Sequence, residues 1–105
     1  MRYGLKPEET GKIRTVFSRY TQIEKAVLYG SRAKGNYRHD SDIDLVLTGK
    51  ELNLSILMKI ENDIDDLLLP YKVDLSLFHE IENQDLTDHI KRVGVNFYER
   101  NGSNE

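Results

Sequence analysis

The chain of 105 residues is long enough for one domain with a single hydrophobic core, and it is too short for a catalytic domain plus a separate substrate domain. Its 18 acidic and 15 basic residues give a net charge of −3 without a basic stripe, which argues against general nucleic-acid binding. Because cysteine is absent and no apolar run is long enough to cross a bilayer, we expect no disulfide, no cysteine zinc site and no membrane association, and we expect a cytoplasmic protein.

The first predicted element is a helix that begins at Pro7. Proline is favoured in the first turn of a helix, and Glu8 and Glu9 put negative charge at the positive end of the helix dipole. The apolar residues that follow have the spacing of one helix face: Ile13, Val16, Phe17 and Tyr20. We expect residues 1 to 6 and 101 to 105 to be loose, at the ends of a single domain that spans 1 to 105.

A β-prone run from Ile23 to Tyr29 is predicted to be the first strand, and it stops at Gly30. Ser31 is a good capping residue for a short helical turn that reaches about Asn36. Such a turn directs backbone N–H groups toward an anion. The loop from Gly35 to Ser41 then adds basic residues to an otherwise acidic protein, which favours a phosphate ligand near the glycine turn.

Two aspartates enter the next predicted strand, which runs from Asp42 to Leu47. In a strand, Asp42 and Asp44 point to one face, about 6.6 Å apart along the chain, while Ile43 points to the other. Two carboxylates this close repel each other unless a cation lies between them. The pair therefore predicts a site for divalent cations.

The second half of the chain is predicted to contain a helix, a strand and a last helix. The apolar pattern from Leu54 to Leu68 is the longest amphipathic helix pattern in the sequence, and Pro70 ends it. The run from Val73 to Phe78 alternates as a third strand. A last helix is predicted from the spacing of Leu86, Ile90, Val93 and Phe97, with Gly94 as a weak point or a break within it.

A third acid, Asp74, lies in that third strand on the face opposite its apolar residues. Phosphoryl transfer with two metal ions about 3.5 to 4 Å apart needs carboxylates that bridge the ions, and a group that accepts the proton of the attacking hydroxyl. Asp42 and Asp44 are the natural bridging pair, and Asp74 is the candidate for the third ligand and base. The alternative for Asp74 is a solvated or capping acid without a catalytic role.

The spacing of Gly30-Ser31, ten further residues and Asp42-Ile43-Asp44 resembles the signature of the DNA polymerase β-like nucleotidyltransferases. The short chain is similar to their minimal subset, the MNT proteins. The order of elements predicts an α/β (α+β) fold whose sheet has three or more strands, with helices packed mainly on one face. The resemblance implies the polymerase β-like palm, with a mixed sheet, as the version of this fold.

The resemblance also implies roles for individual residues. Asp42, Asp44 and Asp74 would hold two Mg²⁺ ions, and Gly30 with Ser31 would hold the triphosphate. We expect Arg32 and Ser41 to contribute further contacts to the nucleotide.

We therefore predict a Mg²⁺-dependent nucleotidyltransferase that moves AMP from ATP to a hydroxyl group. MNT proteins are often paired with a small helical HEPN protein, in which case the HEPN protein is the toxin and the MNT protein the antitoxin that adenylylates it. Two alternatives stay open. One is a catalytically weak nucleotide-binding module that neutralises a helical partner by binding alone, and the other is adenylylation of a small molecule, which usually needs a further domain.

Overall fold

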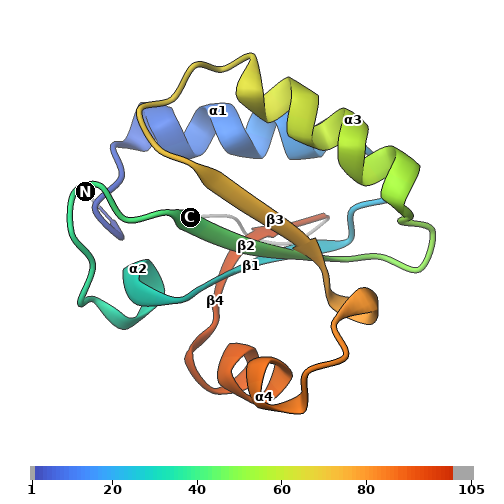
Figure 1. Ribbon diagram of the computed structural model, residues 1–105. Helices are drawn as coiled ribbons and strands as arrows, with labels where there is room; N and C mark the ends of the chain where they lie inside the picture. The colour runs from blue at the N-terminus through green and yellow to red at the C-terminus, as the bar shows by residue number, and fades with distance from the viewer. Residues whose placement is uncertain (1, 101–105) are drawn as a thin grey trace.

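The protein folds around a mixed sheet with the strand order β3-β2-β1-β4, in a computed structural model that describes residues 2–100 (Figure 1). The four strands are β1 (Lys25–Tyr29), β2 (Ile43–Thr48), β3 (Val73–Leu77) and β4 (Val95–Glu99). Strand β1 pairs antiparallel with both β2 and β4, whereas β2 and β3 are parallel. The sequence-based prediction of an α/β fold with a mixed sheet of three or more strands is confirmed.

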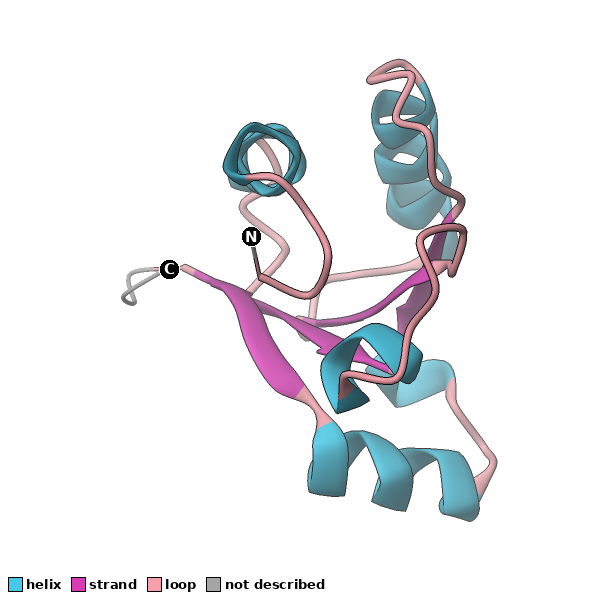
Figure 2. Cartoon of the chain, turned by 90° about the vertical axis from the view of Figure 1, so that its left-hand side faces the viewer, coloured by secondary structure: helices cyan, strands magenta, loops and turns pink. Residues whose placement is uncertain are grey.

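The two long helices cover one face of the sheet. These are α1 (Pro7–Ser18) and α3 (Leu54–Asp65), which Figure 2 shows together on the same side. A shorter helix, α4 (Gln84–Val93), lies on the opposite side after the 3-10 turn η1 (Phe78–Glu80). The single turn α2 (Ser31–Lys34) follows directly after β1.

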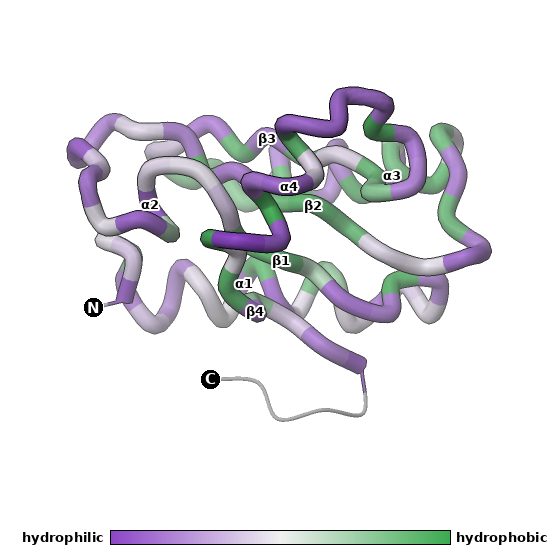
Figure 3. Tube along the Cα trace, turned by 90° about the horizontal axis from the view of Figure 1, so that it is seen from below, coloured by the Kyte–Doolittle hydropathy of each residue, from purple (hydrophilic) through white to green (hydrophobic). Residues whose placement is uncertain are grey.

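Alternation along the strands divides the buried residues between the two faces of the sheet. In β2, Leu45 belongs to the large core under α1 and α3, while Val46 belongs to a smaller cluster with Tyr29 and Ile90. Asp44 lies two residues before Val46 and therefore points to the same face, under α4. Figure 3, seen from the side of α4, shows the central strands β1 and β2 as largely hydrophobic. This face thus combines a small apolar cluster with the carboxylate of Asp44.

The predicted last helix is wrong beyond Val93. The chain leaves α4 at Gly94, and residues Val95–Glu99 form β4 instead of a further helical turn. A Cβ at Gly94 would lie 2.6 Å from Val27 Cγ1 and would overlap the carbonyl oxygen of Ile90, so only glycine lets the chain pass this close to β1. Phe97 fits the helical spacing by coincidence, and its ring packs edge-on against Phe17 at 6.3 Å.

The predicted third helix is too long at its C-terminal end. Helix α3 ends at Asp65, and Leu68 adopts a left-handed conformation with φ of 55°. The side chain of Leu68 is 87% exposed, so it contributes almost nothing to the core that the apolar pattern predicted for it.

The segment before α1 is ordered by contacts that no local sequence pattern indicates. Arg2 and Leu5 form an isolated antiparallel bridge, and Leu5 is 1% exposed within the large core. The expectation of a loose segment is therefore wrong for residues 2 to 6, while residues 1 and 101 to 105 lie outside the described part of the chain. Within that part, no helix is long and apolar enough to cross a membrane.

Candidate active site

Asp44 and Asp74 stand side by side on neighbouring strands. They are direct partners in the parallel register of β2 and β3, and strands paired in this way are about 4.8 Å apart. Their neighbours Leu45 and Leu75 point into the large core, so both carboxylates point to the face under α4. The structure thus brings together two acids that are 30 positions apart in the sequence.

Asp42 lies one residue before β2, because that strand begins at Ile43 and not at Asp42 as predicted. Its side chain is exposed, whereas that of Asp44 is half-buried. Even so, the charge of Asp42 acts on Asp44 and raises its pKa. The three predicted acids therefore belong to one electrostatic cluster at the edge where β2 and β3 begin.

Burial is the main reason why the pKa of Asp44 is raised above its ordinary value. The negative charges of Asp74 and then Asp42 raise it further, and the ammonium group of Lys72 opposes the shift. Ionised Asp44 is therefore destabilised in the protein as it stands, and a cation bound nearby would relieve that repulsion. The oxygen ligands that these carboxylates offer are also the ligands that Mg²⁺ prefers.

The acidic side chains of this cluster are not positioned as a complete metal-binding site. Among residues 2–100, no group of three or more histidine, aspartate or glutamate side chains is placed so that it could hold a metal ion without adjustment. The cluster fits Mg²⁺ in the type and charge of its ligands, and rotation of the exposed Asp42 and Asp74 side chains is the adjustment open to it. The role of these acids as metal ligands stays a prediction.

Gly30 lies directly against Asp44. Its φ of 77° and ψ of −156° belong to a region that only glycine adopts readily. A Cβ at this position would also overlap Asp44 Oδ2, so the absent side chain leaves the room in which the carboxylate sits. Ser31, the first residue of α2, is half-buried next to this contact. The position of the Asp44 carboxylate therefore depends on the absence of a side chain at Gly30.

Arg32 is buried and binds the loop that leads into Asp42. Its side chain is 1% exposed, and its guanidinium donates hydrogen bonds to backbone carbonyl oxygens of Tyr3 at 2.9 Å, His39 at 3.2 Å and Ser41 at 2.9 Å and 3.1 Å. The rings of Tyr37 and Tyr71 lie 5.2 Å and 4.7 Å from its central carbon. Arg32 therefore holds the loop before Asp42 against the N-terminal segment, and its predicted contact with the nucleotide stays a prediction.

Ser41 helps to shape the same loop. Its hydroxyl oxygen accepts a hydrogen bond of 2.8 Å from the backbone N–H of Arg38, and its carbonyl oxygen accepts from Arg32. The hydroxyl proton of Ser41 can still be donated to a ligand. The basic side chains of Lys34, Arg38 and His39 are exposed on this loop. Contacts from Ser41 or these side chains to a phosphate stay predictions.

Sequence analysis missed two residues beside the acids. Tyr29 is the cross-strand partner of Asp44, and burial followed by the charges of Asp44 and Asp74 raises the pKa of its hydroxyl, against a hydrogen bond with Ser76 that lowers it. Lys72 lies two positions before Asp74, on the same side of the chain, and is exposed. Strand alternation could have indicated both Tyr29 and Lys72, because each of these residues shares a face with a predicted acid.

Comparisons with known proteins agree on the fold. The family model described as "Polymerase beta, Nucleotidyltransferase" matches residues 11–103. A comparison with curated proteins gives no significant match.

Solved structures of toxin–antitoxin complexes contain similar chains. A chain of a toxin–antitoxin complex with AMP-PNP is 18% identical with a TM-score of 0.71, over 87% of this chain and 73% of the other. A chain from a complex of tri-AMPylated Shewanella oneidensis HEPN toxin with MNT antitoxin is 15% identical with a TM-score of 0.67, over 92% and 75% of the two chains. At this level of identity the likeness establishes the fold.

Proposed function

Since this chain belongs to the polymerase β nucleotidyltransferase family, we propose that it transfers AMP from ATP to a hydroxyl group of a partner protein. The observation that carries the proposal is the pairing of Asp44 with Asp74, with Asp42 beside them and Gly30 packed against Asp44. A structural role alone does not explain why like charges are placed side by side at a strand end.

In the proposed reaction, the acceptor oxygen attacks the α-phosphorus of ATP. A bond forms between that oxygen and phosphorus, the bond from the α-phosphorus to the oxygen that bridges it to the β-phosphorus breaks, and pyrophosphate leaves. Asp74 accepts the proton of the hydroxyl, because its carboxylate is exposed and can reach an incoming group. The turn at Gly30 and Ser31 holds the β- and γ-phosphates.

Asp42, Asp44 and Asp74 would hold two Mg²⁺ ions. When bound, these ions supply positive charge that stabilises the attacking and leaving oxygens. The chain itself supplies the placement of the acids: the register of β2 and β3 fixes Asp44 beside Asp74, and Arg32 fixes the loop that leads into Asp42.

We propose that the partner is a small helical HEPN-type protein and that this chain is its antitoxin. The support is the likeness to chains from toxin–antitoxin complexes, of which one is described with AMP-PNP and another with a tri-AMPylated HEPN toxin.

The test is transfer of label from ATP labelled at its α-phosphate. The chain is produced together with its candidate helical partner, and the purified complex is incubated with labelled ATP and Mg²⁺. We expect covalent label on a hydroxyl-bearing residue of the partner, and loss of that label with Asp44→Asn. Stable binding of both ATP and partner without any label would refute the proposed transfer.

A second function is tested with the same variant. In it, the domain would hold a nucleotide weakly and neutralise its partner by covering it. In that case, the Asp44→Asn variant would neutralise the partner as well as the unaltered chain does. Growth of cells that express the partner with either variant distinguishes the two functions.

A further inference from the structure

Lys72 joins the three acids in a group of four charged side chains at one edge of the sheet. The parallel ladder of β2 and β3 begins at Ile43, whose backbone N–H donates a hydrogen bond of 2.9 Å to the carbonyl oxygen of Lys72. Asp42 and Lys72 each lie one residue before the first pair of this ladder, so they are neighbours on adjoining segments. Two residues further on, Asp44 and Asp74 form the next pair on the same face.

The ammonium group of Lys72 acts on the acids without being bound to one of them. Its positive charge opposes the rise in the pKa of Asp44, although the Lys72 side chain is exposed. Within residues 2–100, Lys72 forms no ion pair with a carboxylate. Lys72 therefore changes the electrostatic potential at the acids and leaves their carboxylates available to a ligand.

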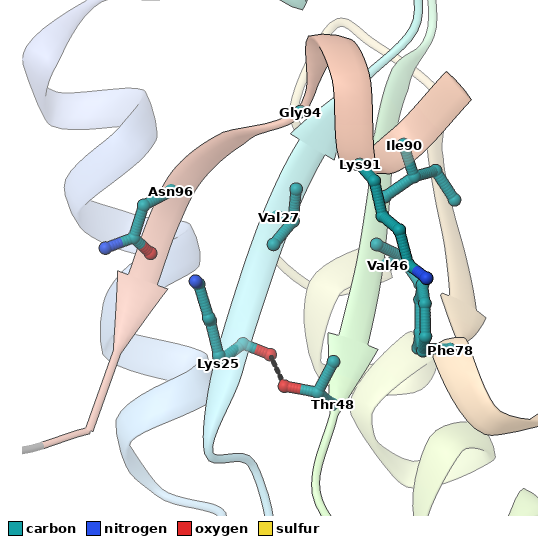
Figure 4. Close-up of a pocket in the computed structure, with 9 residues that line it drawn as sticks. All are labelled: Lys25, Val27, Val46, Thr48, Phe78, Ile90, Lys91, Gly94 and Asn96. Atoms are coloured by element: carbon teal, nitrogen blue, oxygen red, sulfur yellow. Dashed lines mark hydrogen bonds between the residues drawn. The ribbon is translucent and has the colours of Figure 1, made fainter. Parts of the chain in front are cut away.

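Two other lysines on this face lie further along the sheet. Lys25 begins β1, four residues before that strand ends at Tyr29, which is about 13 Å in an extended chain. Figure 4 shows Lys25 and Lys91 around a pocket under α4. The buried side chain of Tyr29, the cross-strand partner of Asp44, lies between that pocket and the acids. Lys72, at the start of β3, is the lysine that shares the edge with the acids.

The charges of this group balance one divalent cation. Three carboxylates and one ammonium group leave two negative charges, which a single Mg²⁺ ion neutralises. The second ion of the proposed reaction then needs negative charge from elsewhere, and a triphosphate supplies it. The turn proposed to hold the phosphates follows β1, whereas Lys72 precedes β3, and β2 with its acids lies between them.

We propose that Lys72 makes the site select Mg·ATP over the free divalent cation. Its ammonium group repels a lone cation that approaches the acids, because no negative charge arrives with that cation. With Mg·ATP, the phosphates bring negative charge to the same site, and their attraction for Lys72 offsets its repulsion of the cation. This proposal rests on the proposed function, and it describes how metal ions enter the site together with the nucleotide.

The expected size of the effect follows from the spacing of the strands. Neighbours on adjoining strands are about 4.8 Å apart, and residues two apart in one strand are about 6.6 Å apart. At these distances in a solvated and screened site, one charge changes the affinity for a divalent cation by about three- to tenfold. For Mg·ATP the two opposing contributions leave a change of less than about twofold.

The test measures metal binding separately from nucleotide binding and from transfer. Mn²⁺ binding to the full chain without nucleotide is followed by electron paramagnetic resonance, and Mg·ATP affinity is measured by calorimetry. The variants are Lys72→Gln, which removes the charge, and Lys72→Arg, which keeps it. Lys59→Gln is the matched control, because Lys59 is exposed on α3, on the other side of the sheet.

We expect Lys72→Gln to bind Mn²⁺ about three- to tenfold more tightly, with a smaller gain at high salt, and to bind Mg·ATP within about twofold of the unaltered chain. Lys72→Arg and Lys59→Gln should bind both as the unaltered chain does. Three outcomes would overturn the proposal: no tighter Mn²⁺ binding by Lys72→Gln, equal tightening of Mn²⁺ and Mg·ATP, or a large loss of Mg·ATP affinity, which would make Lys72 a phosphate ligand. The expected selectivity without any transfer would count against the proposed function alone.

Discussion

Replacement of Arg32 by lysine tests whether this residue holds the loop rather than the nucleotide. The guanidinium of Arg32 donates hydrogen bonds to three backbone carbonyl groups, and the Arg32 side chain is 1% exposed. A lysine keeps the charge but has one nitrogen atom, which cannot reach all three oxygens. Hydrogen bonds from a charged group contribute about 1.5 to 3 kcal/mol each, so the loss of two gives about 3 to 6 kcal/mol of destabilisation.

The assay is unfolding by urea, monitored by circular dichroism, for Arg32→Lys and for Arg38→Lys. Arg38 is an exposed residue of the same loop, so its conservative replacement should change the free energy of unfolding by less than about 0.5 kcal/mol. A loss of less than about 1 kcal/mol in Arg32→Lys, together with a large loss of Mg·ATP affinity, would refute the structural role and restore the predicted nucleotide contact.

Three further predictions concern stability and binding. Because the pKa of Asp44 is raised, the folded state holds its proton more tightly than the unfolded state, so stability should fall as pH rises from the ordinary carboxyl range through the raised pKa. Asp44→Asn should lack this fall and be more stable at pH 7 by about 1 kcal/mol, which is the repulsion between charges about 4.8 Å apart in a high dielectric. Thermal unfolding at several pH values measures both effects. Ser31→Ala should weaken Mg·ATP binding about tenfold or more by calorimetry, and equal affinities would remove Ser31 from the site. Leu68→Gly should raise the free energy of unfolding by up to about 1 kcal/mol, because glycine relieves the left-handed φ of 55° and little apolar burial is lost, whereas a loss of stability would contradict this reasoning.

Much of the candidate site could be predicted because strand alternation is a local property. The alternation of Asp44 with Ile43 and Leu45 placed its carboxylate on the face away from the core, and the same pattern placed Asp74. Alternation does not predict the register in which two strands pair. The direct pairing of Asp44 with Asp74 depends on how β2 and β3 align, which is set by packing across the whole sheet.

The errors arose where contacts distant in sequence outweighed a local pattern. Phe97 has helical spacing with Ile90, yet it joins a strand because β1 offers backbone pairing and Phe17 offers a ring contact. The burial of Arg32 was likewise not indicated by its basic segment, because it depends on the N-terminal segment, where the carbonyl oxygen of Tyr3 accepts a hydrogen bond from its guanidinium. No pattern within the segment itself reports such a contact.

The central claim is that three acids act together in transfer, and comparison of Asp42→Asn, Asp44→Asn and Asp74→Asn tests it most directly. Single-turnover transfer from labelled ATP is measured beside Mg·ATP affinity for each variant. We expect Asp42→Asn and Asp44→Asn to lose both, because each removes a charged ligand. Asp74→Asn should keep its nucleotide affinity within a few fold and lose about 10² to 10⁴ in rate, as for a lost general base. Transfer by Asp74→Asn at the unaltered rate would contradict the claim.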